Sequence, residues 1–406
     1  MTLDKIIKSK ALPSFCTSNS EVIKSILFFC HIKKLPCLIE CTSNQVNQHG
    51  GYTNKTPKKF VKEILGLRKK IGFNSKRLFL GGDHLGPLPW GKKTNHIAIK
   101  NSISLIKDYL NENFSKIHID TSIKCKNDKY INSEIVFNRT SKILNNSIIK
   151  KKIKDKFLVV GTEVPLAGSG DSKNIIKTST KQIEIEFFNF KKIFQKLNLE
   201  KKFFGLVIEP GMKYDHSTIK KPNFNNFIKK NNLSKKNNFV YEAHSTDYQS
   251  QKILKQLVIN NFKFLKVGPE LTYNYARSLF FMESIENDNI KLKNSNVKKT
   301  IFSTMLKNKK YWNGYYTKKK PKLFLNSKLD RMRYYFDTKE VTNSVKKLKK
   351  NINLIDKKNI IRFMDIDTKN KFLNFSKRKL SNFDTIKLIF ISRTLNKYFS
   401  SCGYRI

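Results

Sequence analysis

Short apolar runs alternate with longer amphipathic segments through most of the chain. Apolar runs that end in polar residues or Gly are typical of buried strands. Eight such runs occur, at 12–16, 37–41, 77–80, 116–120, 157–161, 204–209, 239–242 and 264–267. The pattern therefore predicts eight strands separated by longer elements.

The segments between these runs carry the 3.6-residue periodicity of helices. One helix is predicted at 56–71, where Thr56 is a suitable N-cap and Pro57 suits the first helical position. Further helices are predicted at 95–111, 133–152, 181–197, 247–261 and 272–286. The pattern is weaker after the first and sixth strands.

Eight strand–helix units within roughly 275 residues are the number and size of a closed TIM (β/α)8 barrel, an α/β fold. A doubly wound open sheet is the alternative, although it usually has fewer units. We assign this barrel to residues 1–287. Residues 288–406 are predicted to form a mainly helical region packed on it, with helices at 341–351 and 383–398.

The charge of the chain would by itself suggest a nucleic-acid partner. The 81 basic residues exceed the 31 acidic ones by 50, but 71 of the basic residues are Lys and only 10 are Arg. Lys, Asn, Ile and Phe share A/T-rich codons, so base composition of the gene explains the excess more simply. Proteins that read nucleic acids favour Arg for bidentate contacts. We therefore expect no specific nucleic-acid partner.

Cysteine usage and hydropathy bear on the compartment. The six Cys include no CxxC pair, which favours a reducing cytoplasm over a disulfide scaffold. No apolar run approaches the roughly 20 residues that span a bilayer, so no membrane partner is expected. The 39% of hydrophobic residues is enough for a core, which argues against global disorder.

The candidate chemistry lies just after the predicted strands, because barrels place their active sites at the C-terminal strand ends. Three of the seven His follow the third, sixth and seventh strands: His84, His216 and His244. Three His ligands with open positions form a catalytic metal site, most often for Zn²⁺. This set is the predicted metal site, whereas His118 lies within a strand run and is expected to be a hydrogen-bonded core or rim residue.

Carboxylates flank these His. Asp83 directly precedes His84 and is placed to reach a substrate, while Asp120 and Glu163 are placed to orient ligands or move protons. Small and polar residues at the strand ends are candidates for binding substrate or its phosphate, particularly in the last two loops. These candidates are Asn44, Gln45, Gly168, Ser245, Thr246, Asp247 and Gly268.

Five long motifs resemble the Z-type, non-catalytic subunit family of D-tagatose-1,6-bisphosphate aldolase, which is related to the class II aldolases. They lie at 40–48 with 50–53, at 81–87, at 161–165, at 241–249 and at 265–269. The segment 330–335 extends the resemblance into the C-terminal region, so that it covers nearly the whole chain. Pro89 and Trp90 depart from the family pattern beside the third-strand motif.

The resemblance implies an accessory subunit that stabilises and activates a separate class II aldolase catalytic subunit. The resemblance implies that this subunit acts in the catabolism of galactitol, N-acetylgalactosamine or tagatose. It leaves open whether the chain forms a homo-oligomer. The alternative is a metal-dependent D-tagatose 6-phosphate 4-epimerase or aldolase acting alone on a ketose phosphate. In that case Asp83 would take the proton of the C4 hydroxyl, and either cleavage or epimerisation would follow.

Overall fold

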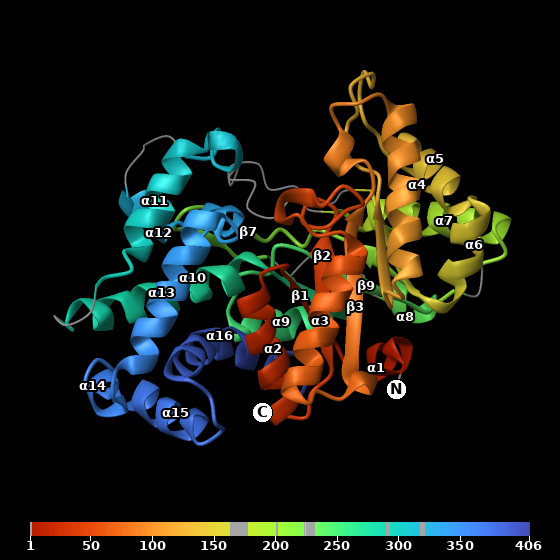
Figure 1. Ribbon diagram of the computed structural model, residues 1–406. Coiled ribbons are helices and arrows are strands. Elements are labelled where there is room, and N and C mark those ends of the chain that lie inside the picture. Colours follow the sequence, from red (N-terminus) through yellow and green to blue (C-terminus); the bar gives the residue numbers. More distant parts are fainter. Residues whose placement is uncertain are drawn as a thin grey trace.

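The computed structural model describes residues 2–162, 178–199, 202–222, 224, 232–289, 293–316 and 321–406. Eight parallel strands close into a barrel in the order β1-β10-β9-β6-β5-β4-β3-β2 (Figure 1). They are β1 (Leu12–Cys16), β2 (Cys37–Thr42), β3 (Leu78–Leu85), β4 (Lys116–Asp120), β5 (Phe157–Gly161), β6 (Phe204–Val207), β9 (Phe239–Ala243) and β10 (Phe262–Val267). The closure confirms the predicted TIM barrel and excludes the open sheet.

The apolar runs identified the strands because a parallel barrel buries both faces of each strand. Every residue of β1, β4, β5 and β9 is buried. The predicted runs 12–16, 116–120 and 157–161 coincide with β1, β4 and β5. Strand β3 continues beyond the predicted 77–80 as far as Leu85 and so includes Asp83 and His84.

The helices that accompany the barrel agree with the predicted ones in most places. They are α1 (Leu3–Ser9), α2 (Ser20–Ile32), α3 (Pro57–Ile71), α4 (Asn95–Asn111), α5 (Ser133–Leu144), α6 (Ser147–Lys152), α7 (Thr180–Lys196), α8 (Asn232–Lys236), α9 (Gln251–Ile259) and α10 (Pro269–Asn287). The Thr56 side chain caps α3 by accepting from the N–H of Lys59, as predicted.

Two predicted helices are shorter or divided, and local capping gives the reason. The segment 133–152 forms α5 and α6, because Asn146 accepts from the N–H of Ile149 and begins a new helix. The segment predicted from 247 becomes helical only at α9, where Ser250 accepts from the N–H of Ile253. The side chain of Asp247 is used elsewhere, as described below.

The connection after β6 contains a two-stranded antiparallel hairpin instead of leading directly to a helix. Its strands are β7 (Lys213–Tyr214) and β8 (Ile219–Lys220). The turn between them contains His216. The β7–β8 hairpin therefore determines where His216 lies relative to the barrel.

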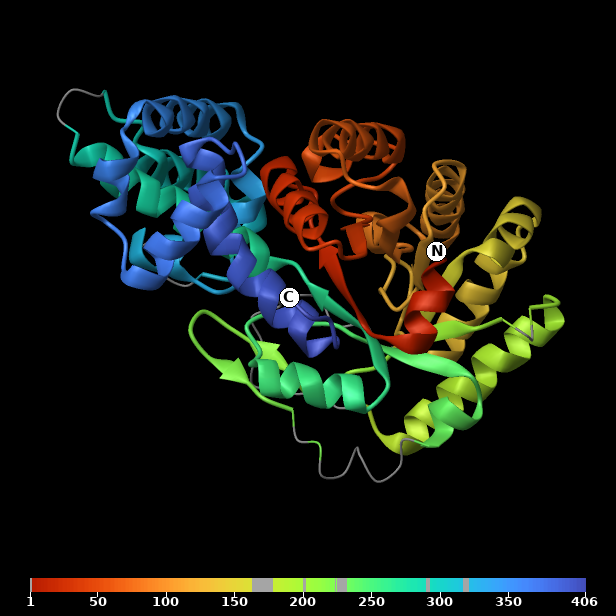
Figure 2. The same cartoon turned by 90° about the horizontal axis from the view of Figure 1, so that it is seen from below.

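The C-terminal region is helical, as predicted, and it packs on the barrel (Figure 2). Its helices are α11 (Val297–Lys307), α12 (Pro321–Asn326), α13 (Lys339–Leu354), α14 (Lys357–Ile361), α15 (Ile366–Ser376) and α16 (Asn382–Ser401). Helix α16 contacts α2, α9 and α10. Its Phe399 ring lies 5.6 Å from Phe15 of β1 and 6.2 Å from Phe29 of α2, centroid to centroid.

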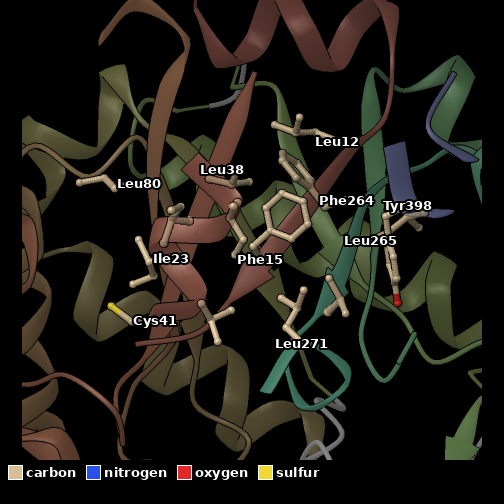
Figure 3. Close-up of a cluster of buried hydrophobic side chains, with 14 of the residues drawn as sticks. Leu12, Phe15, Ile23, Leu38, Cys41, Leu80, Phe264, Leu265, Leu271 and Tyr398 are labelled. Atoms are coloured by element: carbon tan, nitrogen blue, oxygen red, sulfur yellow. The ribbon is translucent and has the colours of Figure 1, made fainter. Parts of the chain in front are cut away.

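The hydrophobic core is continuous between the barrel and this last helix. Figure 3 draws Tyr398 of α16 in the same cluster of buried hydrophobic side chains as the barrel residues Phe264 and Leu265. All three side chains are fully buried. In the described part of the chain, no helix combines the length and apolar character needed to cross a membrane.

Candidate functional site

Two consecutive residues of β3, Asp83 and His84, point to the same buried cluster. Side chains normally alternate between the two faces of a strand. Here the pairing of β3 with β4 shifts between Gly82 and Leu85, and His84 has a φ of 48°. A β-bulge of this kind redirects a side chain. The bulge therefore explains how both members of the Asp-His pair reach the interior.

Glycines of the same motif allow the close approach that the cluster requires. A Cβ atom on Gly81 would lie 2.7 Å from Cγ of Glu40, so the missing side chain leaves room for that glutamate. A Cβ atom on Gly86 would lie 1.6 Å from the carbonyl oxygen of Asp120. Only Gly fits at position 86, because the neighbouring atom is rigid backbone.

Three imidazole rings gather at the C-terminal ends of the strands. The ring of His84 lies 5.1 Å from that of His244 and 5.3 Å from that of His118, and the last two rings are also 5.3 Å apart. All three side chains are buried. The structure thus brings together His84 and His244, as expected, with His118 as the third ring.

His118 belongs to a set that reasoning from strand ends alone did not find. Lys116, His118 and Asp120 alternate with two isoleucines along β4, so that all three side chains lie on the interior face. Polar residues at every second position of a fully buried strand were the signal in the sequence. The expectation that His118 is a hydrogen-bonded residue holds, but its partner is Asp83 of the cluster.

Asp83 is the most heavily contacted carboxylate of the cluster. Its Oδ1 lies 2.8 Å from Nδ1 of His118 and also contacts the ammonium of Lys266. Burial alone would raise the pKa of Asp83, but His84, Lys266 and His118 hold this pKa well below its usual range. Asp83 is therefore an ionised acceptor, and while Lys266 is in contact it is a weak base.

Asp120 orients His84 and is itself held in place. Its Oδ2 lies 2.7 Å from Nδ1 of His84, while its Oδ1 accepts from the N–H and hydroxyl of Ser122 at 2.9 and 2.6 Å. Burial opposes ionisation, yet the contact with His84 lowers the pKa of Asp120. A carboxylate that fixes one ring nitrogen sets the orientation of the other.

A second layer of buried charge lies next to the histidines. The ammonium of Lys116 is 2.7 Å from Oε1 of Glu40 and 2.5 Å from Oε2 of Glu242, and all three side chains are fully buried. Oε1 of Glu242 is 2.8 Å from Nε2 of His244. Glu40, Lys116 and Glu242 were not predicted as site residues, because they lie within strands.

The cluster has the composition of a site for a divalent metal ion. Asp83, His118, Glu242 and His244 each offer one ligand atom, and these atoms all lie within 4.8 Å of one another. Burial lowers the pKa of His118, and burial together with Lys266 lowers that of His244 to about 3. Both rings are therefore neutral, which is the form that binds metals.

The hydrogen bonds of these two rings leave one nitrogen of each available. His118 uses Nδ1 toward Asp83 and His244 uses Nε2 toward Glu242, whose carboxylates only accept. Nε2 of His118 and Nδ1 of His244 are buried without a hydrogen-bond partner among the described residues. A cluster of neutral imidazoles and carboxylates has the ligand types that a divalent metal such as Zn²⁺ prefers.

The structure places His216 away from this cluster, contrary to the expected ligand set. Its Nδ1 lies 2.8 Å from the hydroxyl of Ser327, and its Nε2 lies 3.1 Å from the carbonyl oxygen of Tyr315. Both ring nitrogens are thus engaged with the C-terminal region. The β7–β8 hairpin accounts for the difference, since it carries His216 out of the barrel connection.

The residues expected to bind substrate or phosphate fall into three groups. Asn44, Gln45, Ser245, Asp247 and Gly268 line one cavity together with Asp83, His84 and His244. Thr246 is directed elsewhere, because its hydroxyl donates to the carbonyl of Lys266. Gly168 lies outside the described residues, as does Glu163, which was predicted as a catalytic residue.

The cavity is formed jointly by the barrel and the C-terminal region. Its volume is about 190 Å³. The barrel contributes the strand ends and loops named above. The C-terminal region contributes Tyr315, Arg331, Arg333, Tyr334 and Asp337. A cavity of this size, lined by carboxylates, imidazoles and arginines, suits a small polar ligand.

Comparisons with known proteins agree with these features. The family model "D-tagatose-1,6-bisphosphate aldolase subunit GatZ/KbaZ-like" matches residues 1–403. The GatZ subunits of Escherichia coli O6:K15:H31 and Salmonella dublin are each 34% identical to this chain, over 358 and 353 residues. The alignments cover 84% of this chain, and 85% and 84% of those proteins.

A solved structure agrees with the whole fold. A probable tagatose 6 phosphate kinase from Sinorhizobium meliloti 1021 superimposes with a TM-score of 0.84 at 25% sequence identity. The match covers 97% of this chain and all of the other. The barrel and the helical C-terminal region therefore recur together in one known architecture.

Proposed function

The chain belongs to the D-tagatose-1,6-bisphosphate aldolase subunit GatZ/KbaZ-like family, and we propose that it supports a separate class II aldolase catalytic subunit as its Z-type partner. The observation that carries this proposal is the match to the family over residues 1–403, with curated GatZ relatives at 34% identity. The physiological context would be the catabolism of tagatose or related sugars. All six cysteines are free thiols, which suits a cytoplasmic role.

Mixing experiments test the partnership directly. The purified chain is added to a class II tagatose-bisphosphate aldolase catalytic subunit, and cleavage of tagatose 1,6-bisphosphate and the half-life of activity at elevated temperature are measured. Both should rise with the concentration of the chain until they saturate. Serum albumin at equal mass is the control for non-specific stabilisation. A catalytic subunit whose rate and half-life stay unchanged would count against the proposal.

The assembled cluster favours a second candidate function, turnover of a ketose phosphate by the chain itself. Support of a partner through surface contacts requires no buried carboxylate beside three imidazoles. Asp83 and His84 nevertheless line the cavity together with His244. The substrate of this second function would be a ketose monophosphate such as tagatose 6-phosphate.

The residues of the cluster divide the tasks that such a reaction needs. His118, Glu242 and His244 would hold a divalent ion, which when bound would polarise the ketose carbonyl, and Asp83 beside them would be left to act on a substrate hydroxyl. Asp120 fixes the orientation of His84 through the 2.7 Å contact. Asp83 can act as a base only when Lys266 moves from its carboxylate, because the ammonium lowers the pKa of Asp83.

We expect the purified chain to bind a divalent metal, with Zn²⁺ as the preferred ion. Metal content after loading and dialysis is the measurement. His118→Ala and His244→Ala should lose most of the bound metal, because each removes a neutral imidazole from the cluster. His216→Ala is the matched control and should retain the ion, because both nitrogens of that ring serve the C-terminal region.

Equal metal content in wild type and in the His118→Ala and His244→Ala variants would contradict this site. Loss of metal from His216→Ala and His244→Ala, with retention in His118→Ala, would instead support the ligand set expected from the strand ends. Circular dichroism of each variant shows whether the fold is retained.

A further inference from the structure

Two arginines of the C-terminal region form part of the cavity wall. Arg331 and Arg333 belong to a short 3-10 helix, Arg331–Tyr335. Both line the cavity that also contains Asp83 and His84. The C-terminal region therefore brings two positive charges to the same cavity as the acid and imidazole side chains of the barrel.

Contacts with rings, hydroxyls and carbonyls help to orient both guanidinium groups. The guanidinium carbon of Arg331 lies 3.2 Å from the ring centroid of Tyr315, and Nη1 donates to the hydroxyl of Tyr334 at 3.2 Å. Nη1 of Arg333 donates to the carbonyls of Leu329 and Asp330 at 2.6 and 2.8 Å. Contacts of this kind hold a guanidinium group in one orientation.

The scarcity of Arg in this chain supports a specific role for Arg331 and Arg333. Only 10 of 81 basic residues are Arg, and two of the ten lie in one cavity wall two positions apart. Lys supplies the same charge but neither the planar fork nor the stacking on a ring. In a chain that otherwise uses Lys, Arg at both positions indicates a requirement for bidentate recognition, which phosphate and carboxylate groups provide.

The usual phosphate-binding groups of a barrel are already engaged here. Barrels commonly bind phosphate with the loops after the last two strands and the N-terminus of a nearby helix. In this chain Oδ1 of Asp247 accepts from the N–H groups of Gly268 and Glu270, at 3.0 and 2.8 Å. Residue 269, between them, is Pro and has no N–H. The carboxylate of Asp247 thus takes the place that a phosphate would occupy at the start of α10.

We propose that Arg331 and Arg333 bind the phosphate group of a ketose phosphate, whose hydroxyl-bearing carbons face Asp83 and His84. The inference rests on the proposed function for the ketose and on the cavity for the anion. Negative charge is thereby bound at the wall from the C-terminal region, while the hydroxyl groups meet the carboxylates of the barrel. Residues 330–335 then form part of the binding site as well as of the C-terminal fold.

Calorimetric titration tests this assignment with three probes: D-tagatose 6-phosphate, D-tagatose and inorganic phosphate. Arg331→Met and Arg333→Met should each weaken the binding of tagatose 6-phosphate by about 10- to 100-fold, the usual loss for a charge-assisted contact. Binding of tagatose itself should change little. Inorganic phosphate should bind weakly to wild type and lose affinity in the same variants.

Arg277 provides a matched control outside the cavity. Its guanidinium carbon is 4.9 Å from the centroid of Tyr273, and Nη1 donates to the side chain of Asn326 at 2.6 Å. Arg277→Met should therefore bind all three probes like wild type. If a Met variant fails to fold, the Lys variant at that position takes its place, with an expected loss of about 10-fold because charge is kept and the fork is removed.

Three outcomes would overturn the assignment: no saturable binding of tagatose 6-phosphate to wild type, equal affinity in wild type and the folded Arg variants, or equal weakening for tagatose and its phosphate. The same preparations are assayed for activation of a class II aldolase catalytic subunit. Activation by wild type with unaltered phosphate affinity in the variants overturns only this inference. Absence of activation with selective loss of phosphate affinity overturns only the partnership.

Discussion

Lys116→Met is expected to lower the free energy of unfolding by about 3–5 kcal/mol at neutral pH. The ammonium of Lys116 is the shared partner of Glu40 and Glu242, at 2.7 and 2.5 Å, inside the barrel. Removing it leaves two buried carboxylates without their cation. Because a domain of this kind is stable by roughly 5–15 kcal/mol, the variant should be near the limit of folding. Urea unfolding followed by circular dichroism measures the loss.

The pH dependence of this loss has a definite sign. Burial raises the pKa of Glu242, but Lys116 is the chief group that lowers it, and the net pKa lies below the usual value of 4.5. A carboxyl with a lowered folded-state pKa contributes stability above its unfolded pKa and loses that contribution as the pH falls. The difference between wild type and Lys116→Met should therefore shrink below about pH 4.5.

Two further variants show how much of the stability loss comes from breaking the buried ion pairs. Lys62→Met changes an exposed lysine of α3 and should alter stability by less than about 0.5 kcal/mol. Adding Glu40→Gln to Lys116→Met should recover part of the loss, because one unpaired charge is removed. A Lys116→Met variant as stable as Lys62→Met would show that the buried network contributes nothing net.

The sequence predicts the fold more completely than the site, and the reason is physical. Strands of a parallel barrel are covered on both faces, so β1, β4 and β5 were readable as apolar runs. Residues that follow strands were readable as candidate site residues, and Asp83 and His84 do reach the cluster. His118 was not assigned to the metal site, because its strand was interpreted as core and the alternation of polar residues along β4 was not used.

The alternation of strands and helices in the sequence does not predict the hairpin that determines where His216 lies. The position after the sixth strand predicted a residue at the mouth of the barrel. An inserted hairpin instead directs His216 toward Ser327 and Tyr315. Likewise, a contact such as Asp247 with the N–H groups of α10 requires the three-dimensional meeting of two loops. Local propensity does not specify such long-range contacts.

Asp83→Asn is expected to separate the partner role from chemistry at the cluster. Asp83 is fully buried, and its contacts with His118 and Lys266 lie inside the barrel. Support of a catalytic subunit through surface contacts should therefore persist in the variant. Any turnover of a ketose phosphate by the chain alone should fall by about 10²–10⁴-fold, the usual contribution of a positioned general base.

The comparison requires that the variant folds, which urea unfolding and circular dichroism establish. Ser217→Ala, on an exposed turn residue of the β7–β8 hairpin, is the control and should match wild type in both assays. Loss of partner activation in a folded Asp83→Asn protein would tie the support function to the cluster itself. Unchanged turnover would exclude Asp83 as the base.

Lys266→Met should change the pH dependence of any turnover by the chain. Because Lys266 lowers the pKa of Asp83, the substitution should raise that pKa and move the acidic limb of the activity profile to higher pH.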